Sequence, residues 1–109
     1  MKLTVRKNYS RHYLDPIRVR RGDIVIVRER ASEWQGWKWC LHPDGREGWV
    51  PEKILKLRKD VAEILEDYDA AELSVASGES VEGEREESGW IWCRNRNGEA
   101  GWLPREIFH

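Results

Sequence analysis

Apolar and polar side chains alternate over short stretches of this 109-residue chain, and a two-residue period is typical of half-buried β-strands. Residues 23–28 are rich in β-branched side chains and follow a glycine, whereas residues 37–41 are aromatic and alternating. Residues 42–45 end in Asp-Gly and residues 95–98 in Asn-Gly, and these pairs readily adopt the positive φ of tight hairpin turns. The pattern predicts an all-β protein in which helices are nearly absent.

The same pattern occurs twice, 53 residues apart. Residues 36–40 read Gly-Trp-Lys-Trp-Cys and residues 89–93 read Gly-Trp-Ile-Trp-Cys, and nine of the twenty aligned positions from 36 to 55 are identical. An array of stacked repeats needs about three or more units to bury a continuous core. Two copies of about 50 residues therefore predict two small closed domains instead.

Prolines mark where the last long strand of each copy ends. Pro51 and Pro104 remove a backbone donor and so close the strands before them. One short helical turn is expected after each proline, at residues 52–54 and 105–107.

The predicted domain boundaries follow from these repeats. We expect domain 1 at residues 1–57, a linker at residues 58–61 and domain 2 at residues 62–109. Such a short, charged linker has little reach, so the two domains are expected to pack against each other in a monomer.

The net charge of −1 conceals two oppositely charged halves. Residues 1–59 hold fifteen Lys or Arg and seven Asp or Glu, whereas residues 60–109 hold four and thirteen. Domain 1 is therefore expected to be basic and domain 2 acidic. This asymmetry either holds the domains face to face, gives each a different partner, or reflects solvated faces without a role.

The chemical inventory argues against catalysis. The three histidines are scattered, and Cys40 and Cys93 occupy equivalent positions of separate domains, where two buried free thiols are expected. No glycine-rich phosphate loop occurs, and the carboxylates form no constellation for general acid–base work. We expect no enzyme activity, no metal site and no cofactor.

The first seven residues reach charged side chains before any apolar run develops. This pattern is neither that of a secretory signal nor that of a transmembrane span. We expect a cytoplasmic protein without a membrane partner.

Several of these motifs resemble those of the SH3 domain, a small five-stranded barrel that docks proline-rich peptides in an aromatic groove. The similar segments are residues 5–9 and 64–68 for the opening Ala-Leu-Tyr-Asp-Tyr, residues 16–19 and 72–75 for Glu-Leu-Ser-Phe, and residues 48–51 and 101–104 for Gly-aromatic-aliphatic-Pro. The resemblance covers nearly the whole chain. It implies two tandem five-stranded SH3-like barrels joined by a short linker.

The resemblance also implies one groove in each domain, built from a tyrosine, a tryptophan and a proline of the same repeat. The ligand-binding candidates of domain 1 are Tyr9, Tyr13, Trp34, Trp37, Trp49 and Pro51, and those of domain 2 are Tyr68, Asp69, Glu72, Glu86, Glu87, Trp90, Trp102 and Pro104. Family ligands commonly carry an Arg or Lys that meets carboxylates beside the tryptophan. Domain 2 is therefore expected to favour a basic or Pro-Arg segment, and the partner of the chain is expected to be a protein or peptide with a proline-rich or basic segment.

Three functions are compatible with these features. The leading hypothesis is a non-catalytic adaptor that binds a protein or peptide segment in the grooves, or whose two domains pack together as a scaffold. The second is nucleic-acid binding by the basic domain, with its arginines meeting phosphates and its tryptophans stacking on bases. The third is binding of cell-wall peptides, as in bacterial SH3-like repeats.

Overall fold

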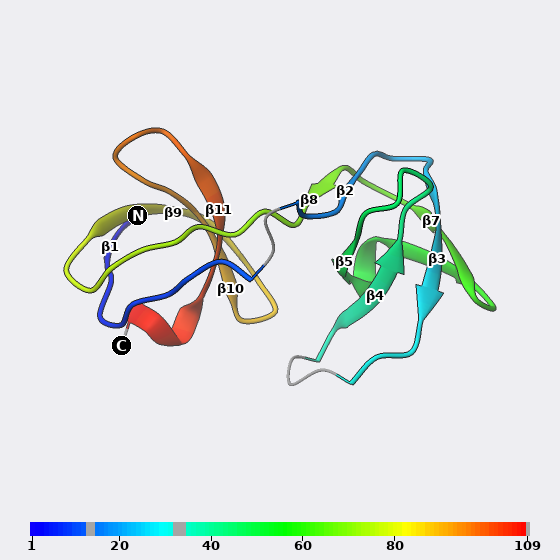
Figure 1. The fold of residues 1–109 in the computed structure, drawn as a ribbon, viewed down its shortest axis with the longest axis horizontal. Helices are drawn as coiled ribbons and strands as arrows, with labels where there is room; N and C mark the ends of the chain where they lie inside the picture. Colours follow the sequence, from blue (N-terminus) through cyan, green and yellow to red (C-terminus); the bar gives the residue numbers. More distant parts are fainter. Residues whose placement is uncertain (13–14, 32–34, 109) are drawn as a thin grey trace. The chain divides into compact units, whose positions relative to one another are not determined.

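The structure is a computed structural model that describes residues 1–12, 15–31 and 35–108. The strands are β1 (Lys2–Thr4), β2 (Arg18–Val19), β3 (Ile24–Arg28), β4 (Trp37–Leu41), β5 (Glu47–Pro51), β6 (Leu55–Arg58), β7 (Val61–Ile64), β8 (Tyr68–Asp69), β9 (Ser80–Glu87), β10 (Trp90–Arg94) and β11 (Ala100–Pro104). Two 3-10 helices, η1 (Glu52–Ile54) and η2 (Arg105–Phe108), follow β5 and β11 (Figure 1). All pairs of these strands are antiparallel, and the predicted all-β class is confirmed.

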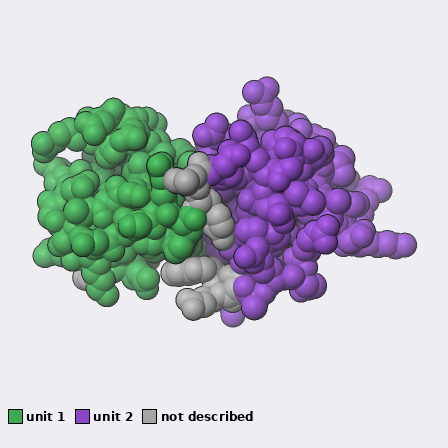
Figure 2. Space-filling view, in the orientation of Figure 1, with its two compact units in different colours: residues 1–14, 71–109 green, residues 15–70 purple. Residues whose placement is uncertain are grey.

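The chain forms two compact units, and their composition differs from that of the predicted domains (Figure 2). Unit 1 contains residues 1–14 and 71–109, and unit 2 contains residues 15–70. Unit 1 holds a four-stranded sheet of order β1-β9-β10-β11. Unit 2 holds a five-stranded sheet of order β5-β4-β3-β7-β6 and the two-stranded sheet β2-β8. The predicted boundaries at residues 57 and 62 are therefore not the boundaries of the compact units.

Residues 58–61, predicted as a linker, form a hairpin turn inside unit 2. Arg58 of β6 pairs with Val61 of β7, so that only two residues reverse the chain. Lys59, the first of these two, has a φ of 59°, and tight hairpins commonly need such a positive φ. Because the turn has only two residues, the strand after it pairs with the strand before it. The opening strand of the second repeat is thereby held in unit 2.

The opening strands of the two repeats are exchanged between the units. In unit 1, the Val5 N–H donates to the Glu79 carbonyl over 2.8 Å. In unit 2, the Ile64 N–H donates to the Asp23 carbonyl over the same 2.8 Å. β1 of the first repeat thus pairs with β9 of the second, and β7 of the second repeat pairs with β3 of the first. We call residues 1–14 the N-terminal arm, residues 60–70 the central arm, residues 15–59 the first body and residues 71–109 the second body.

Charge favours the exchanged pairing. The N-terminal arm has four Lys or Arg and no acidic residue, and it joins the second body, which has four basic and eight acidic residues. The central arm has five Asp or Glu and no basic residue, and it joins the first body, which has eleven basic and seven acidic residues. Each arm therefore packs onto a body of opposite net charge. The units carry net charges of 0 and −1, so the predicted basic and acidic domains do not exist as compact units.

Side-chain size favours the same pairing. A Cβ atom added to Gly83 in the second body would lie 2.8 Å from the Leu3 side chain of the N-terminal arm. The repeat places Val27 of the first body at the position of Gly83, and Ala62 of the central arm at the position of Leu3. Each unit thus combines one large and one small residue there. Pairing within a repeat would bring the two large residues together and leave the two small ones facing a void.

Each unit buries an apolar core of its own. The core of unit 1 consists of Val5, Leu73, Val75, Val81, Ile91, Cys93, Leu103 and Ile107. Buried residues of unit 2 include Ile17, Val19, Val25, Cys40, Val50, Ile54, Ala62 and Ile64. In each core the arm contributes fully buried aliphatic side chains, Val5 in one and Ile64 in the other. The arms are therefore integral parts of the units they join.

Candidate functional site

An aromatic cluster in unit 1 combines residues from both repeats. The rings of Tyr9 and Trp90 lie with their centroids 6.0 Å apart at an interplanar angle of 75°, an edge-to-face contact. Pro104 of β11 lies directly opposite Trp90 of β10 in the strand register. The N-terminal arm brings the tyrosine to this cluster, and the second body supplies the tryptophan and the proline.

Unit 2 contains the equivalent cluster with the origins reversed. The rings of Trp37 and Tyr68 have centroids 6.3 Å apart at 58°, and Pro51 of β5 lies opposite Trp37 of β4. The prediction that each groove draws its tyrosine from its own repeat is therefore wrong. Both tyrosines lie on the exchanged arms, so Tyr9 joins Trp90 and Tyr68 joins Trp37.

A second pair of tryptophans continues each cluster along the same sheet face. Trp39 and Trp49 form an edge-to-face pair at 5.1 Å in unit 2, and Trp92 and Trp102 form one at 5.2 Å in unit 1. Alternate residues of a strand share a face, so Trp37 and Trp39 lie on one side of β4 while Cys40 points into the core. The predicted site residues Trp49 and Trp102 therefore extend the clusters, although Trp102 is only 3% exposed.

One donor in the unit 2 cluster has no partner among the described residues. The Nε1 atom of Trp37 is buried and makes no hydrogen bond in the part of the chain that the structure describes. The indole N–H is a donor only, and a buried donor without an acceptor is unfavourable. The Trp37 ring itself is half-buried, which leaves part of it accessible to a ligand.

Comparison with protein families places the first repeat in a known group. A family model of the variant SH3 domain matches residues 4–58, which is half of the chain. The chain belongs to the variant SH3 family. Curated proteins show no match, and neither do solved structures. The family match does not extend over the second repeat.

Membership of the variant SH3 family assigns the chain a general role. SH3 domains are typically non-catalytic modules that bind protein or peptide segments. Of the cluster residues, Tyr9, Trp37 and Pro51 lie within the matched range 4–58. The chain is therefore a protein-interaction module in this general sense.

The acidic candidates of the SH3-like clusters are divided between the two units. In unit 1, the Glu72 carboxylate accepts hydrogen bonds from the Tyr9 hydroxyl over 3.1 Å and from the His12 backbone N–H over 2.9 Å. Glu72 therefore orients the tyrosine of this cluster. Asp69, predicted beside Trp90, lies instead in unit 2, where its carboxylate is 3.3 Å from the Arg18 Nε atom.

The remaining carboxylates near Trp90 lie on β9. Glu87 is the register partner of Trp90, and Glu86 accepts a hydrogen bond from Arg105 over 3.2 Å. Glu86 is exposed, so a cationic ligand would compete with Arg105 for its carboxylate. The predicted candidates Tyr13 and Trp34 lie outside the described residues.

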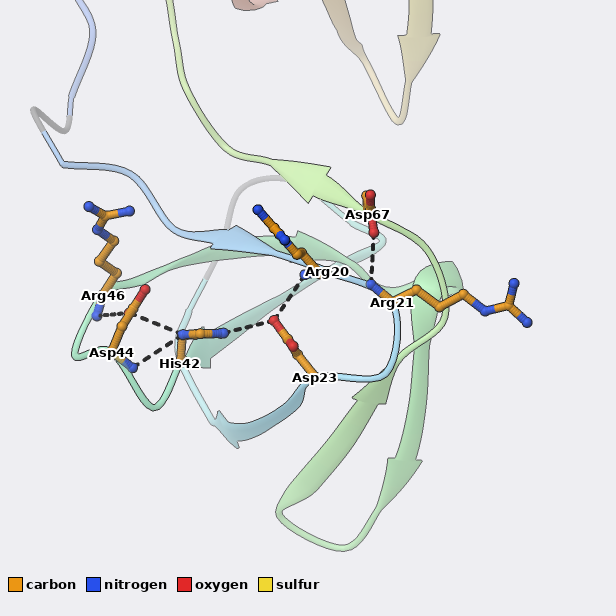
Figure 3. Close-up of polar contacts among 7 residues, drawn as sticks. All are labelled: Arg20, Arg21, Asp23, His42, Asp44, Arg46 and Asp67. Carbon is orange, nitrogen blue, oxygen red and sulfur yellow. Dashed lines mark hydrogen bonds and ion pairs between the residues drawn. The ribbon is translucent and has the colours of Figure 1, made fainter.

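A polar network around His42 in unit 2 was not among the predicted features (Figure 3). Its Nε2 atom lies 2.8 Å from the Asp23 carboxylate and its Nδ1 atom 3.1 Å from that of Asp44. The backbone N–H of Arg20 donates to Asp23 over 2.9 Å. These two contacts, the Arg20 N–H first and His42 second, lower the pKa of Asp23. The network ties the β4–β5 hairpin to the start of β3. In the sequence, residues 42–45 indicated only a turn, so these contacts were not predicted.

The two cysteines are free and buried, as expected from the sequence. Burial raises the pKa of Cys40 and of Cys93 to about 12, so both thiols stay protonated at neutral pH. Within residues 1–12, 15–31 and 35–108, no three His, Cys, Asp or Glu side chains are grouped to hold a metal ion. No described helix is long and apolar enough to span a membrane.

Proposed function

We propose that this variant SH3 protein binds an extended protein segment at the aromatic cluster of each unit. The observation that carries the proposal is the buried Trp37 Nε1 donor, which has no acceptor among the described residues. A backbone carbonyl of a docked segment would supply the missing acceptor. Leaving such a donor unsatisfied costs about 1–3 kcal/mol, and a ligand that displaces the atoms covering the N–H and accepts from it would remove this cost.

The ring geometry suits a polyproline II segment. A segment in this conformation is preformed and has no internal hydrogen bonds, so its carbonyls are free to accept and its prolines to pack on rings. Tyr68, Trp37 and Pro51 provide the rings of the cluster in unit 2, and Tyr9, Trp90 and Pro104 provide those in unit 1. Because Tyr68 is 8% and Trp90 9% exposed, the segment would pack mainly on the half-buried rings of Trp37 in unit 2 and Tyr9 in unit 1.

The two clusters differ in their charge preference. Three of the candidate carboxylates, Glu72, Glu86 and Glu87, belong to unit 1, and one, Asp69, belongs to unit 2. An Arg or Lys of the ligand would find more carboxylates beside Trp90 than beside Trp37. Unit 1 is therefore the proposed site for a basic or Pro-Arg segment.

The nucleic-acid hypothesis loses its main support through the strand exchange. It relied on a strongly basic domain, but five acidic residues of the central arm join the first body and unit 2 has a net charge of −1. Binding to phosphates draws most of its strength from a concentrated positive field. Cell-wall peptides would use the same clusters, so they belong in the same binding experiment.

The test is calorimetric titration of the full chain with a proline-rich peptide that carries one arginine. Trp37→Phe keeps an aromatic ring and removes the N–H, and it is expected to weaken binding at unit 2 about five- to ten-fold, the value of one hydrogen bond. Leu57→Ala, at an exposed side chain of β6 outside the aromatic cluster, is the control and should bind like the wild type. Equal affinities of Trp37→Phe and wild type would contradict the proposal. Binding of a bacterial cell-wall peptide in place of the proline-rich peptide would support the cell-wall hypothesis. Binding of an oligonucleotide instead would support the nucleic-acid hypothesis.

A further inference from the structure

An arginine lies over one of the tryptophans that continue the unit 2 cluster. The Cζ atom of Arg30 is 3.8 Å from the centroid of the Trp39 ring, which is a cation–π contact. Trp39 is only 6% exposed, whereas Arg30 is exposed. A ligand that reaches this place therefore meets the guanidinium rather than the ring beneath it.

The N–H groups of this guanidinium are available to a ligand. Among residues 1–12, 15–31 and 35–108, no group accepts a hydrogen bond from the Arg30 side chain. A guanidinium carries five N–H donors in one plane, and stacking on a ring holds that plane without using any of them. Trp37, two residues before Trp39 on β4, has the buried Nε1 donor described above. Two neighbouring rings on one face of β4 thus present donors that need acceptors.

The spacing of these two rings matches that of an extended peptide. Alternate residues of a strand lie about 6–7 Å apart on one face, and Trp37 and Trp39 are such a pair. A polyproline II segment advances about 3.1 Å per residue, so two of its residues span about 6 Å. A segment that runs along β4 and accepts from Trp37 therefore brings a side chain two residues away to the Arg30 guanidinium.

The charges beside Arg30 leave its guanidinium without a direct counterion. Arg28 is the register partner of Trp39, so a second cation borders this ring. The nearest carboxylates are Glu29, the neighbour of both arginines in the chain, and Glu47, which accepts from the Trp39 Nε1 atom over 3.0 Å. Neither forms an ion pair with Arg30 in the described part of the chain. The other charged residues of β4, β5 and η1 are Lys38, Glu52 and Lys53.

The carboxylates beside Tyr68 are engaged with other groups. Asp67 accepts from the Arg21 backbone N–H over 2.8 Å (Figure 3), and Asp69 lies 3.3 Å from the Arg18 Nε atom. Both contacts offset negative charge on the tyrosine side of the cluster. A carboxylate of a ligand would therefore meet Arg30 and Arg28 as the cations nearest to the Trp39 ring.

Unit 1 contains the same device among more carboxylates. The Cζ atom of Arg85 is 5.3 Å from the centroid of the Trp102 ring. Three glutamates, Glu84, Glu86 and Glu87, lie next to Arg85 in the chain. An anionic ligand would be repelled by these side chains. The stacked arginine is therefore suited to a carboxylate in unit 2 and not in unit 1.

We propose that Arg30 makes unit 2 selective for an acidic segment. Its guanidinium binds a Glu or Asp carboxylate of the segment whose backbone carbonyl accepts from Trp37, and the planar fork allows a bidentate contact. This inference rests on the peptide docking proposed above and names the ligand class of its unit 2 site. Units 1 and 2 then take segments of opposite charge.

The test uses the full chain and two proline-rich peptides that differ only in having glutamate or glutamine two positions from a proline. Amide NMR signals of residues 37–51 report binding at unit 2, and those of residues 90–104 report binding at unit 1. The glutamate peptide should bind unit 2 about three- to five-fold more tightly, as expected for a solvent-exposed charge pair. Added salt should reduce this difference.

Variants of Arg30 identify the guanidinium as the source of the preference. Arg30→Gln should abolish the preference for glutamate, and Arg30→Lys should keep part of it because the charge remains without the planar fork. The glutamine peptide should bind Arg30→Gln like the wild type, which excludes general damage to the site. Arg58→Gln removes an exposed arginine of β6, which β3 and β7 separate from β4, and this control should keep the full preference.

The possible failures of this test are distinguishable. Equal affinities of the glutamate and glutamine peptides at unit 2 would overturn the inference and leave the docking proposal intact, whereas absence of any shift at unit 2 would contradict both. A glutamate preference that persists in Arg30→Gln would assign the carboxylate to another cation. Binding of a phosphoserine peptide or of an oligonucleotide, but not of the glutamate peptide, would replace the carboxylate by a phosphate and overturn the inference.

Discussion

Gly83 and Leu3 show how single residues specify which arm joins which body. Leu3 occupies the space that a side chain at position 83 would need, with 2.8 Å between the Leu3 Cδ1 atom and a Cβ atom built on Gly83. At the corresponding place in unit 2 the large residue is Val27 and the small one Ala62. The two pairs are complementary only when the arms are exchanged.

A double-mutant cycle tests this complementarity. Gly83→Val should destabilise unit 1 by about 1–3 kcal/mol through overpacking, and Leu3→Ala by about 2–5 kcal/mol through a cavity. The double variant recreates the Val27 and Ala62 combination and should be more stable than the sum of the single effects by about 1–2 kcal/mol. Urea unfolding measures the three free energies. Strictly additive effects would show that the two side chains do not share one space.

At the scale of the elements, the His42 network holds the β4–β5 hairpin against the start of β3. His42 contacts Asp23 over 2.8 Å and Asp44 over 3.1 Å, and the pKa of Asp23 is lowered by the Arg20 N–H and by His42. A carboxyl whose folded-state pKa lies below its ordinary value of about 3.9 stabilises the fold above that pH. This contribution is lost as the pH falls from about 4 toward the lowered pKa.

Removal of the imidazole tests this contribution. His42→Ala should raise the pKa of Asp23 toward its ordinary value and lower the unfolding free energy at neutral pH by about 0.5–1.5 kcal/mol. Carboxyl NMR titration reports the pKa, and chemical unfolding at pH 7 and pH 3 reports the stability. The destabilisation should shrink at pH 3, where Asp23 loses part of its charge in both proteins. His12→Ala, in unit 1, is the control and should leave the pKa of Asp23 unchanged.

The elements themselves were well predicted from local pattern. The hairpins at residues 42–45 and 95–98 join antiparallel strands, and a short helical turn follows both Pro51 and Pro104. Hydrophobic period, turn residues and proline act over a few neighbours, so the sequence displays them directly. The hairpin at residues 58–61 was missed because Lys59 and Asp60 lack the Gly or Asn that usually marks such a turn, although Lys59 adopts a φ of 59°.

At the scale of the whole molecule, the exchange makes unit 2 a continuous segment and unit 1 a discontinuous one. Unit 2 consists of residues 15–70 and contains every strand of its two sheets. Unit 1 is closed by an arm that lies 56 residues from its body in the chain. A fragment cut at the boundaries of unit 2 therefore keeps all of its partners, whereas a fragment cut at the repeat boundary loses an arm.

Two fragments of similar length test this organisation. Residues 15–70 alone should give a dispersed amide NMR spectrum and a cooperative thermal transition. Residues 1–57 lack the central arm and bring the basic N-terminal arm to a basic body, so they should be unfolded or should assemble with other copies. A folded monomer of residues 1–57, together with an unfolded 15–70, would contradict the exchanged arrangement.

The structure groups the predicted site residues differently from the prediction. Tyr9 contacts Trp90 and Trp37 contacts Tyr68, while the binding role of these four residues stays a prediction. Each tyrosine nevertheless belongs to the cluster of the other repeat. Periodicity and motif spacing identify which side chains lie on a sheet face, but they do not tell which copy of a repeated strand completes a given sheet.

The sequence by itself determined the all-β class, the two copies, the hairpins and the variant SH3 character of the aromatic residues, because local patterns and short motifs carry these features. Only the tertiary structure decided that the opening strands change places. That choice depends on contacts between segments about 55–80 residues apart, namely the size match of Leu3 with Gly83 and the opposite charges of arm and body. The same exchange places the Trp37 ring beside Tyr68 of the other repeat, where a ligand is proposed to bind.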